Sequence, residues 1–173
     1  MQAKEAPRLR DLSEKELHII KEFTDSLGIK IESILNNPKI LIVKGAKFND
    51  VFDFPIYFNG LIDDIKSIYS GGYYLGYIKK EKFHPGIPLA NRISRLCKII
   101  DCIIIDDTGE KIFLYGKNVN QNHLIKFSKG LKVVVNANYE SLGWGIGKVI
   151  NGKKEIKIVE PLKDLGWYLR RGG

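Results

Sequence analysis

From Cys97 onward the chain alternates short β-type runs with turn signals, and this pattern limits the fold more than any other feature. Short strands spaced by about 8–12 residues are typical of a small barrel or sandwich. Asn151 and Gly152 form a hairpin signal between two of the runs. The segment 110–116 is compatible with a strand or with the start of a short helix, and 117–127 with a short helix or a loop. The clearest strands are predicted at 97–106, 131–138, 142–150 and 155–160.

The glycines in "GWGIG" (143–147) resemble a phosphate-binding loop at first sight. A Walker loop needs Ser or Thr after its lysine, but Val149 follows Lys148. Glycine at every second position instead predicts a strand with one bare face, which another backbone segment can approach closely. Trp144 then lies on the opposite face and is expected in the core.

The first half mixes helix and strand signals. Ser13 followed by Glu16 is a capping-box pattern that predicts a helix ending at Gly28. Further helices are predicted over 30–37 and 61–72, and strands over 39–45 and from 73 onward. The expected fold class is α+β, with an N-terminal α/β domain over 1–95 followed by a mostly β domain over 96–173.

The 173-residue chain carries a formal net charge of +8, and its C-terminal part holds most of the excess. From Lys117 onward there are eleven Lys and Arg against four Asp and Glu. A basic surface attracts polyanions, of which nucleic acid is the commonest in a cell. The sequence shows no membrane-length apolar run and no secretory signal, so a cytoplasmic location is expected.

Little in the sequence supports a disulfide, a metal site or a catalytic site. Cys97 and Cys102 on one strand would point to opposite faces, so buried thiols are expected rather than a bridge. The three histidines lack metal-ligand spacing, and we find no nucleophile–histidine–carboxylate grouping. No enzyme activity, metal or cofactor is therefore expected.

The candidate RNA-binding residues are bases of the second half. Seven to ten cations on one small β domain can contact phosphates without reading sequence. Trp167, Tyr168, Tyr139 and Tyr115 are candidate stacking faces, although core packing is the preferred interpretation for Tyr115 and Trp167. The candidate cations are Lys117, Lys129, Lys132, Lys153, Lys154, Lys157, Lys163, Arg170 and Arg171.

The second half resembles a PUA domain, a small pseudo-barrel found in RNA-modifying proteins. The resemblance is carried by "IDDTGEKIFLYGKNV", "KGLKVVVNANYESLGWGIGKV" and "DLGWYLRRG". "FLYGKNV", "DLGWYLRR" and "GYIKKEKFHPGIPLA" are also similar to the Nip-seven family of ribosome-biogenesis proteins, and the N-terminal extension favours an archaeal member. The ending "DLGWYL" would then be the closing strand of the barrel, with Leu165, Trp167 and Leu169 on its buried face.

This resemblance implies an assembly factor for the large ribosomal subunit that acts in rRNA processing and is not itself an enzyme. It implies binding of U- or A-rich pre-rRNA through Lys153, Lys154 and Lys157. Implied partners are other assembly factors, including a Shwachman–Diamond-type protein or exosome components, with a nucleolar or nuclear location in a eukaryote. Two alternatives remain open: the RNA-recognition part of a transglycosylase-like or pseudouridine-synthase-like system, and a protein-interaction adaptor.

Overall fold

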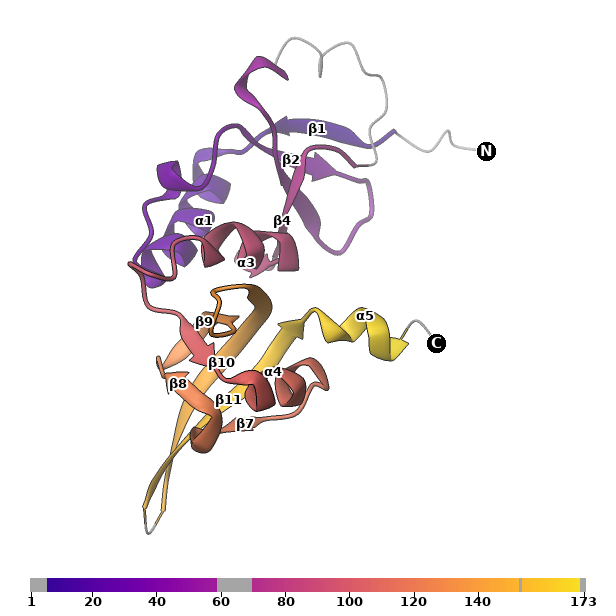
Figure 1. Cartoon of the computed structure of the whole chain (residues 1–173). Helices are drawn as coiled ribbons and strands as arrows, with labels where there is room; N and C mark the ends of the chain where they lie inside the picture. The colour runs from indigo at the N-terminus through magenta and orange to yellow at the C-terminus, as the bar shows by residue number, and fades with distance from the viewer. Residues whose placement is uncertain (1–5, 59–69, 153, 172–173) are drawn as a thin grey trace. The chain divides into compact units, whose positions relative to one another are not determined.

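The computed structural model describes residues 6–58, 70–152 and 154–171, without the side chains of 168, 169 and 171. The chain divides into two compact units, Met1–Leu89 and Ala90–Gly173. Figure 1 shows the helices and strands that form the two units. The boundary expected from the sequence, between 95 and 96, stays a prediction.

The first unit is a five-stranded antiparallel sheet with strands in chain order. Ile20, Ile40 and Val51 are fully buried in its core. The predicted first helix is confirmed, with the Ser13 side chain accepting from the Glu16 backbone N–H and the Glu16 side chain accepting from the Ser13 N–H. The elements are β1 (Arg8–Asp11), α1 (Glu14–Ser26), β2 (Pro38–Ile42), β3 (Asn49–Asp53), β4 (Tyr73–Lys79) and β5 (Lys82–Pro85).

Two other helix predictions in this unit have different outcomes. The segment predicted as a helix over 30–37 forms one 3₁₀ turn, Ile31–Ser33, because Asn36 and Asn37 donate their backbone N–H groups to the Asp53 carboxylate instead of continuing a helix. The helix predicted over 61–72 falls mostly on 59–69, outside the described residues.

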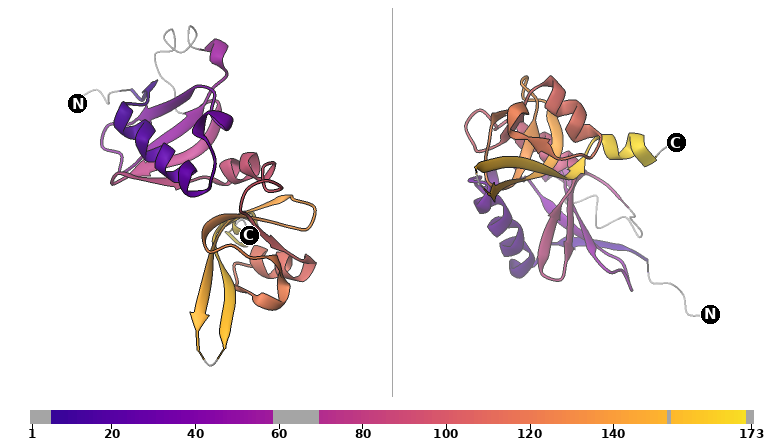
Figure 2. Two further views of the ribbon diagram at one scale, coloured as in Figure 1. Left: turned by 90° about the vertical axis from the view of Figure 1, so that its left-hand side faces the viewer. Right: turned by 90° about the horizontal axis from the view of Figure 1, so that it is seen from below.

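The two faces of this sheet are covered differently. Helix α1 crosses one face (Figure 2), where Phe23 meets Phe83 edge-on with ring centroids 5.1 Å apart. The opposite face carries a smaller aromatic cluster in which Phe52 contacts Tyr74 at 5.4 Å. The sheet therefore has aromatic side chains on both faces, but only one of them is covered by α1.

The second unit is a nearly closed six-stranded barrel sheet, in the order β7-β11-β10-β9-β6-β8. Its core is formed by Ile103, Ile105, Phe113, Val134 and Val159, which are all fully buried. The elements after α3 (Ile87–Ser94) are β6 (Ile103–Ile105), α4 (Asp107–Leu114), β7 (Val119–Asn120), β8 (Leu124–Lys126), β9 (Gly130–Val135), β10 (Ser141–Asn151), β11 (Glu155–Asp164) and α5 (Gly166–Arg171). The α+β class and the mostly β second half are confirmed.

Of the two possibilities for 110–116, the structure forms the helix α4. The Asp106 side chain caps its first turn by accepting the Gly109 N–H at 2.7 Å. The predicted strands at 131–138, 142–150 and 155–160 are present as β9, β10 and β11. Trp144 is fully buried, as expected.

Two predictions about the second half are wrong. Cys97 and Cys102 form a disulfide, because the chain turns at 96–100 instead of running as a strand and so brings their Cα atoms to 5.4 Å. The ending is not a closing strand, because β11 stops at Asp164 and α5 follows. Leu165 and Trp167 are both 44% exposed.

Candidate nucleic-acid interface

Strands β10 and β11 form a hairpin that is longer than the strands beside it (Figure 1). Pairing with β9 ends at Gly147, and pairing of β11 with β7 begins only at Ile158. Lys157 lies at this junction, directly opposite Val149. Its backbone N–H donates to the Gln121 side-chain oxygen at 3.3 Å, so this amide continues the hydrogen bonding where β7 has ended.

Gly147 brings the loop after β8 against β10. A Cβ at this position would lie 1.9 Å from the Ser128 carbonyl oxygen and 3.1 Å from the Phe127 ring. The bare glycine face therefore allows the close backbone approach predicted from the sequence. This approach fixes Phe127 beside Lys157, whose ammonium lies 5.5 Å from the ring centroid.

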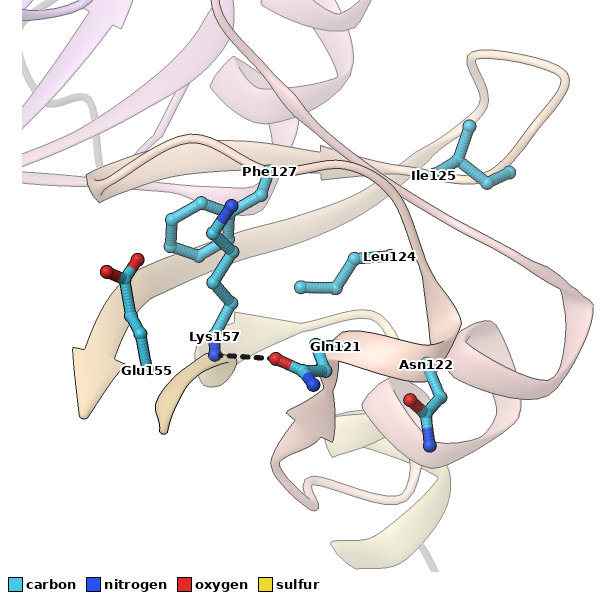
Figure 3. Close-up of a pocket in the computed structure, with 7 residues that line it drawn as sticks. All are labelled: Gln121, Asn122, Leu124, Ile125, Phe127, Glu155 and Lys157. Atoms are coloured by element: carbon cyan, nitrogen blue, oxygen red, sulfur yellow. Dashed lines mark hydrogen bonds between the residues drawn. The ribbon is translucent and has the colours of Figure 1, made fainter. Parts of the chain in front are cut away.

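A pocket of about 560 Å³ opens at this place. Figure 3 shows the Lys157 side chain extending toward the Phe127 ring, with Gln121 below and Asn122 at the far rim. Leu124 and Ile125 supply apolar walls, and Glu155 adds a carboxylate at the edge near Lys157. The lining residues are Gln121, Asn122, Leu124, Ile125, Phe127, Glu155 and Lys157.

The rim formed by residues 121–123 is tied to α4. The Asp106 carboxylate lies 3.1 Å from His123 Nδ1, and the Asp106 N–H donates to the His123 carbonyl at 3.1 Å. The N–H of Gly109, with a smaller effect from His123, lowers the pKa of Asp106. A carboxylate that stays ionised over most of the pH range therefore anchors this rim.

These groups suit a single-stranded nucleotide. An aromatic ring offers a stacking face to any base, and an ammonium next to it can hold a phosphate. Side-chain amides carry both donors and acceptors, which match the edges of an unpaired base. The ring, the cation and the two amides of Gln121 and Asn122 come from three separate stretches of the chain.

The structure brings only some of the predicted cations to this site. Lys157 lines the pocket, and exposed Lys154 lies in the turn before β11, whereas Lys153 is outside the described residues. Exposed Lys129 follows Phe127 by two residues. Lys132 lies on β9 opposite Gly145 and is partly buried.

Three other predicted cations do not line this pocket. Exposed Lys117 follows the end of α4. Lys163 is six residues beyond Lys157 on β11, about 20 Å along the strand, and burial lowers its pKa. The Arg170 guanidinium makes two hydrogen bonds, of 2.9 and 3.0 Å, to the buried Asp164 carboxylate, and it also donates to the Leu114 carbonyl. The side chain of Arg171 lies outside the described residues.

The candidate stacking residues are elsewhere too. Tyr115 is 70% exposed, contrary to the expectation of core packing, because the α4 helix turns it away from the barrel. Trp167 is also more exposed than expected, and Tyr139 lies under the Lys98 ammonium at 5.4 Å. The side chain of Tyr168 falls outside the part of the chain that the structure describes.

Sequence reasoning missed the polar and aromatic parts of the pocket. Phe127, Gln121, Asn122 and Glu155 are not among the residues predicted from the sequence to bind RNA. The one signal that could have indicated Phe127 is the glycine at 147, since a bare strand face needs a segment to cover it. The partner segment itself is fixed only by the tertiary fold.

The described residues contain no group of three or more His, Cys, Asp or Glu side chains placed to hold a metal ion. None of the described helices is long and apolar enough to span a membrane.

Comparisons with known proteins agree with this architecture. A family model described as the UPF0113 PUA domain matches residues 101–173. A UPF0113 protein of Aeropyrum pernix is 35% identical over 167 residues, covering 96% of this chain and 94% of the relative.

Two solved structures share the fold. A hypothetical protein from Pyrococcus horikoshii has a TM-score of 0.57 at 16% identity, with 93% of this chain and 98% of that chain covered. A conserved PUA domain protein from Thermoplasma acidophilum has a TM-score of 0.53 at 12% identity, with 92% and 96% covered. A PUA domain implies RNA binding, and by its similarity to the Aeropyrum protein along nearly its whole length the chain belongs to the UPF0113 family.

Proposed function

We propose that the protein is a ribosome-biogenesis factor of the Nip-seven type that binds single-stranded, U- or A-rich pre-rRNA of the large subunit. It acts by binding and not by catalysis, in the cytoplasm of an archaeal cell, together with other assembly factors. The observation that carries the proposal is the pocket in which the Lys157 ammonium, the Phe127 ring and two side-chain amides face one space. The archaeal origin of the Aeropyrum relative supports the cellular context.

Binding of RNA at this pocket is tested by fluorescence anisotropy with labelled U12 and A12 RNA at several salt concentrations. Phe127→Leu keeps an apolar side chain but removes the stacking ring, so affinity should fall by about 1–3 kcal/mol. Lys157→Ala should make the slope of log affinity against log salt shallower by about 0.7. Lys111→Ala removes one exposed cation from α4 and serves as the matched control.

If Phe127→Leu and Lys157→Ala bind as the control does, the pocket is not the RNA site. The cellular role needs a separate experiment, in which RNA crosslinked to the tagged protein in an archaeal host is sequenced. Enrichment of large-subunit pre-rRNA is the expected result. Enrichment of tRNA would favour the RNA-modification alternative, and the absence of any enriched RNA would favour a protein adaptor.

A further inference from the structure

The first unit carries a row of aromatic rings on the sheet face that α1 leaves uncovered. Tyr77 and His84 are direct partners across β4 and β5, and their rings stack with centroids 4.6 Å apart and planes at 11°. Phe48 continues the row, with its ring 4.8 Å from Tyr77. Phe48 is 45% exposed, and the other two rings are partly exposed.

The strand register places this row opposite α1. The next cross-strand pair, Ile78 and Phe83, points to the α1 side, where Phe83 meets Phe23. Side chains of adjacent residues on a strand point to opposite faces. Tyr77 and His84 therefore lie on the face of the sheet that points away from α1.

Two lysines lie on the same face of the sheet, at the next pair of positions along β4 and β5. Lys79 and Lys82 are direct partners, two residues beyond the Tyr77–His84 pair. Both are exposed, and within the described part of the chain no ion pair joins either of them to an acid. Like charges directly opposite each other destabilise a strand pair. This pair of cations therefore works against the hairpin unless an anion binds to it.

The turn between the two lysines holds them in this position. Lys80 and Glu81 have φ values of 48° and 58°, as a two-residue type I′ turn requires. Residues other than glycine seldom adopt this conformation. The neighbouring acids are already engaged, since Glu81 pairs with Lys15 and Asp50 accepts from the Tyr74 hydroxyl. Among the described residues, neither carboxylate forms an ion pair with Lys79 or Lys82.

We propose that this face of β4 and β5 is a second binding surface for single-stranded RNA. Phe48, Tyr77 and His84 supply the stacking row, and Lys79 and Lys82 hold a backbone phosphate. Two residues along a strand span about 7 Å, which is close to the separation of a base and its phosphate in single-stranded RNA. The surface binds RNA independently of sequence, because stacking accepts every base and an ammonium reads no base edge.

The test measures binding of the full chain to fluorescein-labelled U12 RNA. Lys79→Ala/Lys82→Ala is compared with Lys21→Ala/Lys30→Ala, which removes two exposed cations elsewhere in the same unit. Because the two lysines hold one phosphate, the first double variant should make the slope of log affinity against log salt shallower by about 0.7 relative to the control. Phe48→Ala should lower affinity by about fivefold to a hundredfold.

A direct readout uses NMR of the Tyr77 and His84 ring protons during titration with unlabelled U12 RNA. Ring-current shifts that saturate with the binding curve are expected. Unmoved ring protons at saturating RNA, or equal salt slopes for the two double variants, would overturn the proposal. Loss of binding to poly-glutamate in Lys79→Ala/Lys82→Ala, with no effect of Phe48→Ala on RNA, would instead indicate an acidic protein partner.

This face of β4 and β5 shares no residue with the pocket lined by Phe127 and Lys157. The Lys157 and Phe127 variants test the pocket alone, and the Lys79, Lys82 and Phe48 variants test this face alone. Either site can fail without affecting the result expected for the other.

Discussion

Gly147→Ala tests whether the approach of the 127–129 loop to β10 builds the RNA pocket. The added Cβ would lie 1.9 Å from the Ser128 carbonyl oxygen, and contacts under 3.0 Å are essentially never seen for a real Cβ. The obstructing atom belongs to the backbone, so it cannot rotate away as a side chain could. The loop must therefore retreat by about 1 Å or more, and the Phe127 ring must move with it.

The size of the effect follows from two opposing terms. Alanine in a strand is favoured over glycine by about 0.5–1 kcal/mol. Overpacking of a closely packed site typically destabilises by about 1–3 kcal/mol, and displacement of a backbone carbonyl belongs in the upper part of that range. We expect Gly147→Ala to lower the free energy of unfolding by about 1–2 kcal/mol and to weaken U12 binding in the folded protein.

Guanidinium denaturation followed by circular dichroism measures the first effect, and anisotropy at 25 °C measures the second. Gly152→Ala is the matched control, since its Cβ would meet only the Lys154 carbonyl at 3.8 Å. That variant should stay within about 0.5 kcal/mol of the wild type. A Gly147→Ala protein as stable and as tight-binding as Gly152→Ala would refute the reasoning.

Further expectations concern α5 and the start of α1. Arg170→Ala leaves the buried Asp164 carboxylate without its guanidinium, so the denaturation midpoint should fall while the RNA salt slope stays unchanged; a shallower slope would make Arg170 an RNA contact. The Arg10 hydrogen bond holds the pKa of Glu16 at about 2, below its ordinary 4.5, so its stabilising effect is complete above pH 4.5 and is lost as pH falls toward 2. Glu16→Gln should remove this part of the acid sensitivity, seen in denaturation midpoints between about pH 2 and 6. Ser13→Ala removes the cap and should destabilise by about 1 kcal/mol, measured by urea denaturation.

Local sequence patterns predicted the parts of the fold that depend on local chemistry. Ser13 and Glu16 indicate a helix start because both halves of a capping box lie within four residues. The alternation around Trp144 indicates a strand because each face repeats every second residue. The barrel class follows from a series of such strands, and it does not require knowledge of their order in the sheet.

The errors arise where a distant partner decides the structure. The ending 164–171 alternates like a strand, yet Arg170 folds back onto Asp164 and the segment becomes a helix. Cys97 and Cys102 meet because of a turn that no Gly or Pro marks. Phe127 reaches Lys157 only through the loop approach at Gly147, so the pocket could be predicted as a basic edge but not as a set of residues.

The free end of the β10–β11 hairpin has a consequence for self-association. Beyond Gly147 and before Ile158, the two strands pair only with each other among the described residues. Apart from the Lys157 N–H, which donates to Gln121, their outer edges therefore expose backbone groups without a strand partner. Such edges can add a strand from another molecule, and exposed Ile150 and Ile156 would favour that contact.

Lysine is one of the residues that protect open strand edges from this pairing. Lys154 and Lys157 place positive charge on the ribbon, whereas Lys148 is paired with Glu160 on the neighbouring strand. A second copy would bring the same charges against them and be repelled. The charge that attracts a polyanion thus also keeps copies of the protein apart, and a polyanion that neutralises the ribbon would at the same time remove its protection against pairing with itself.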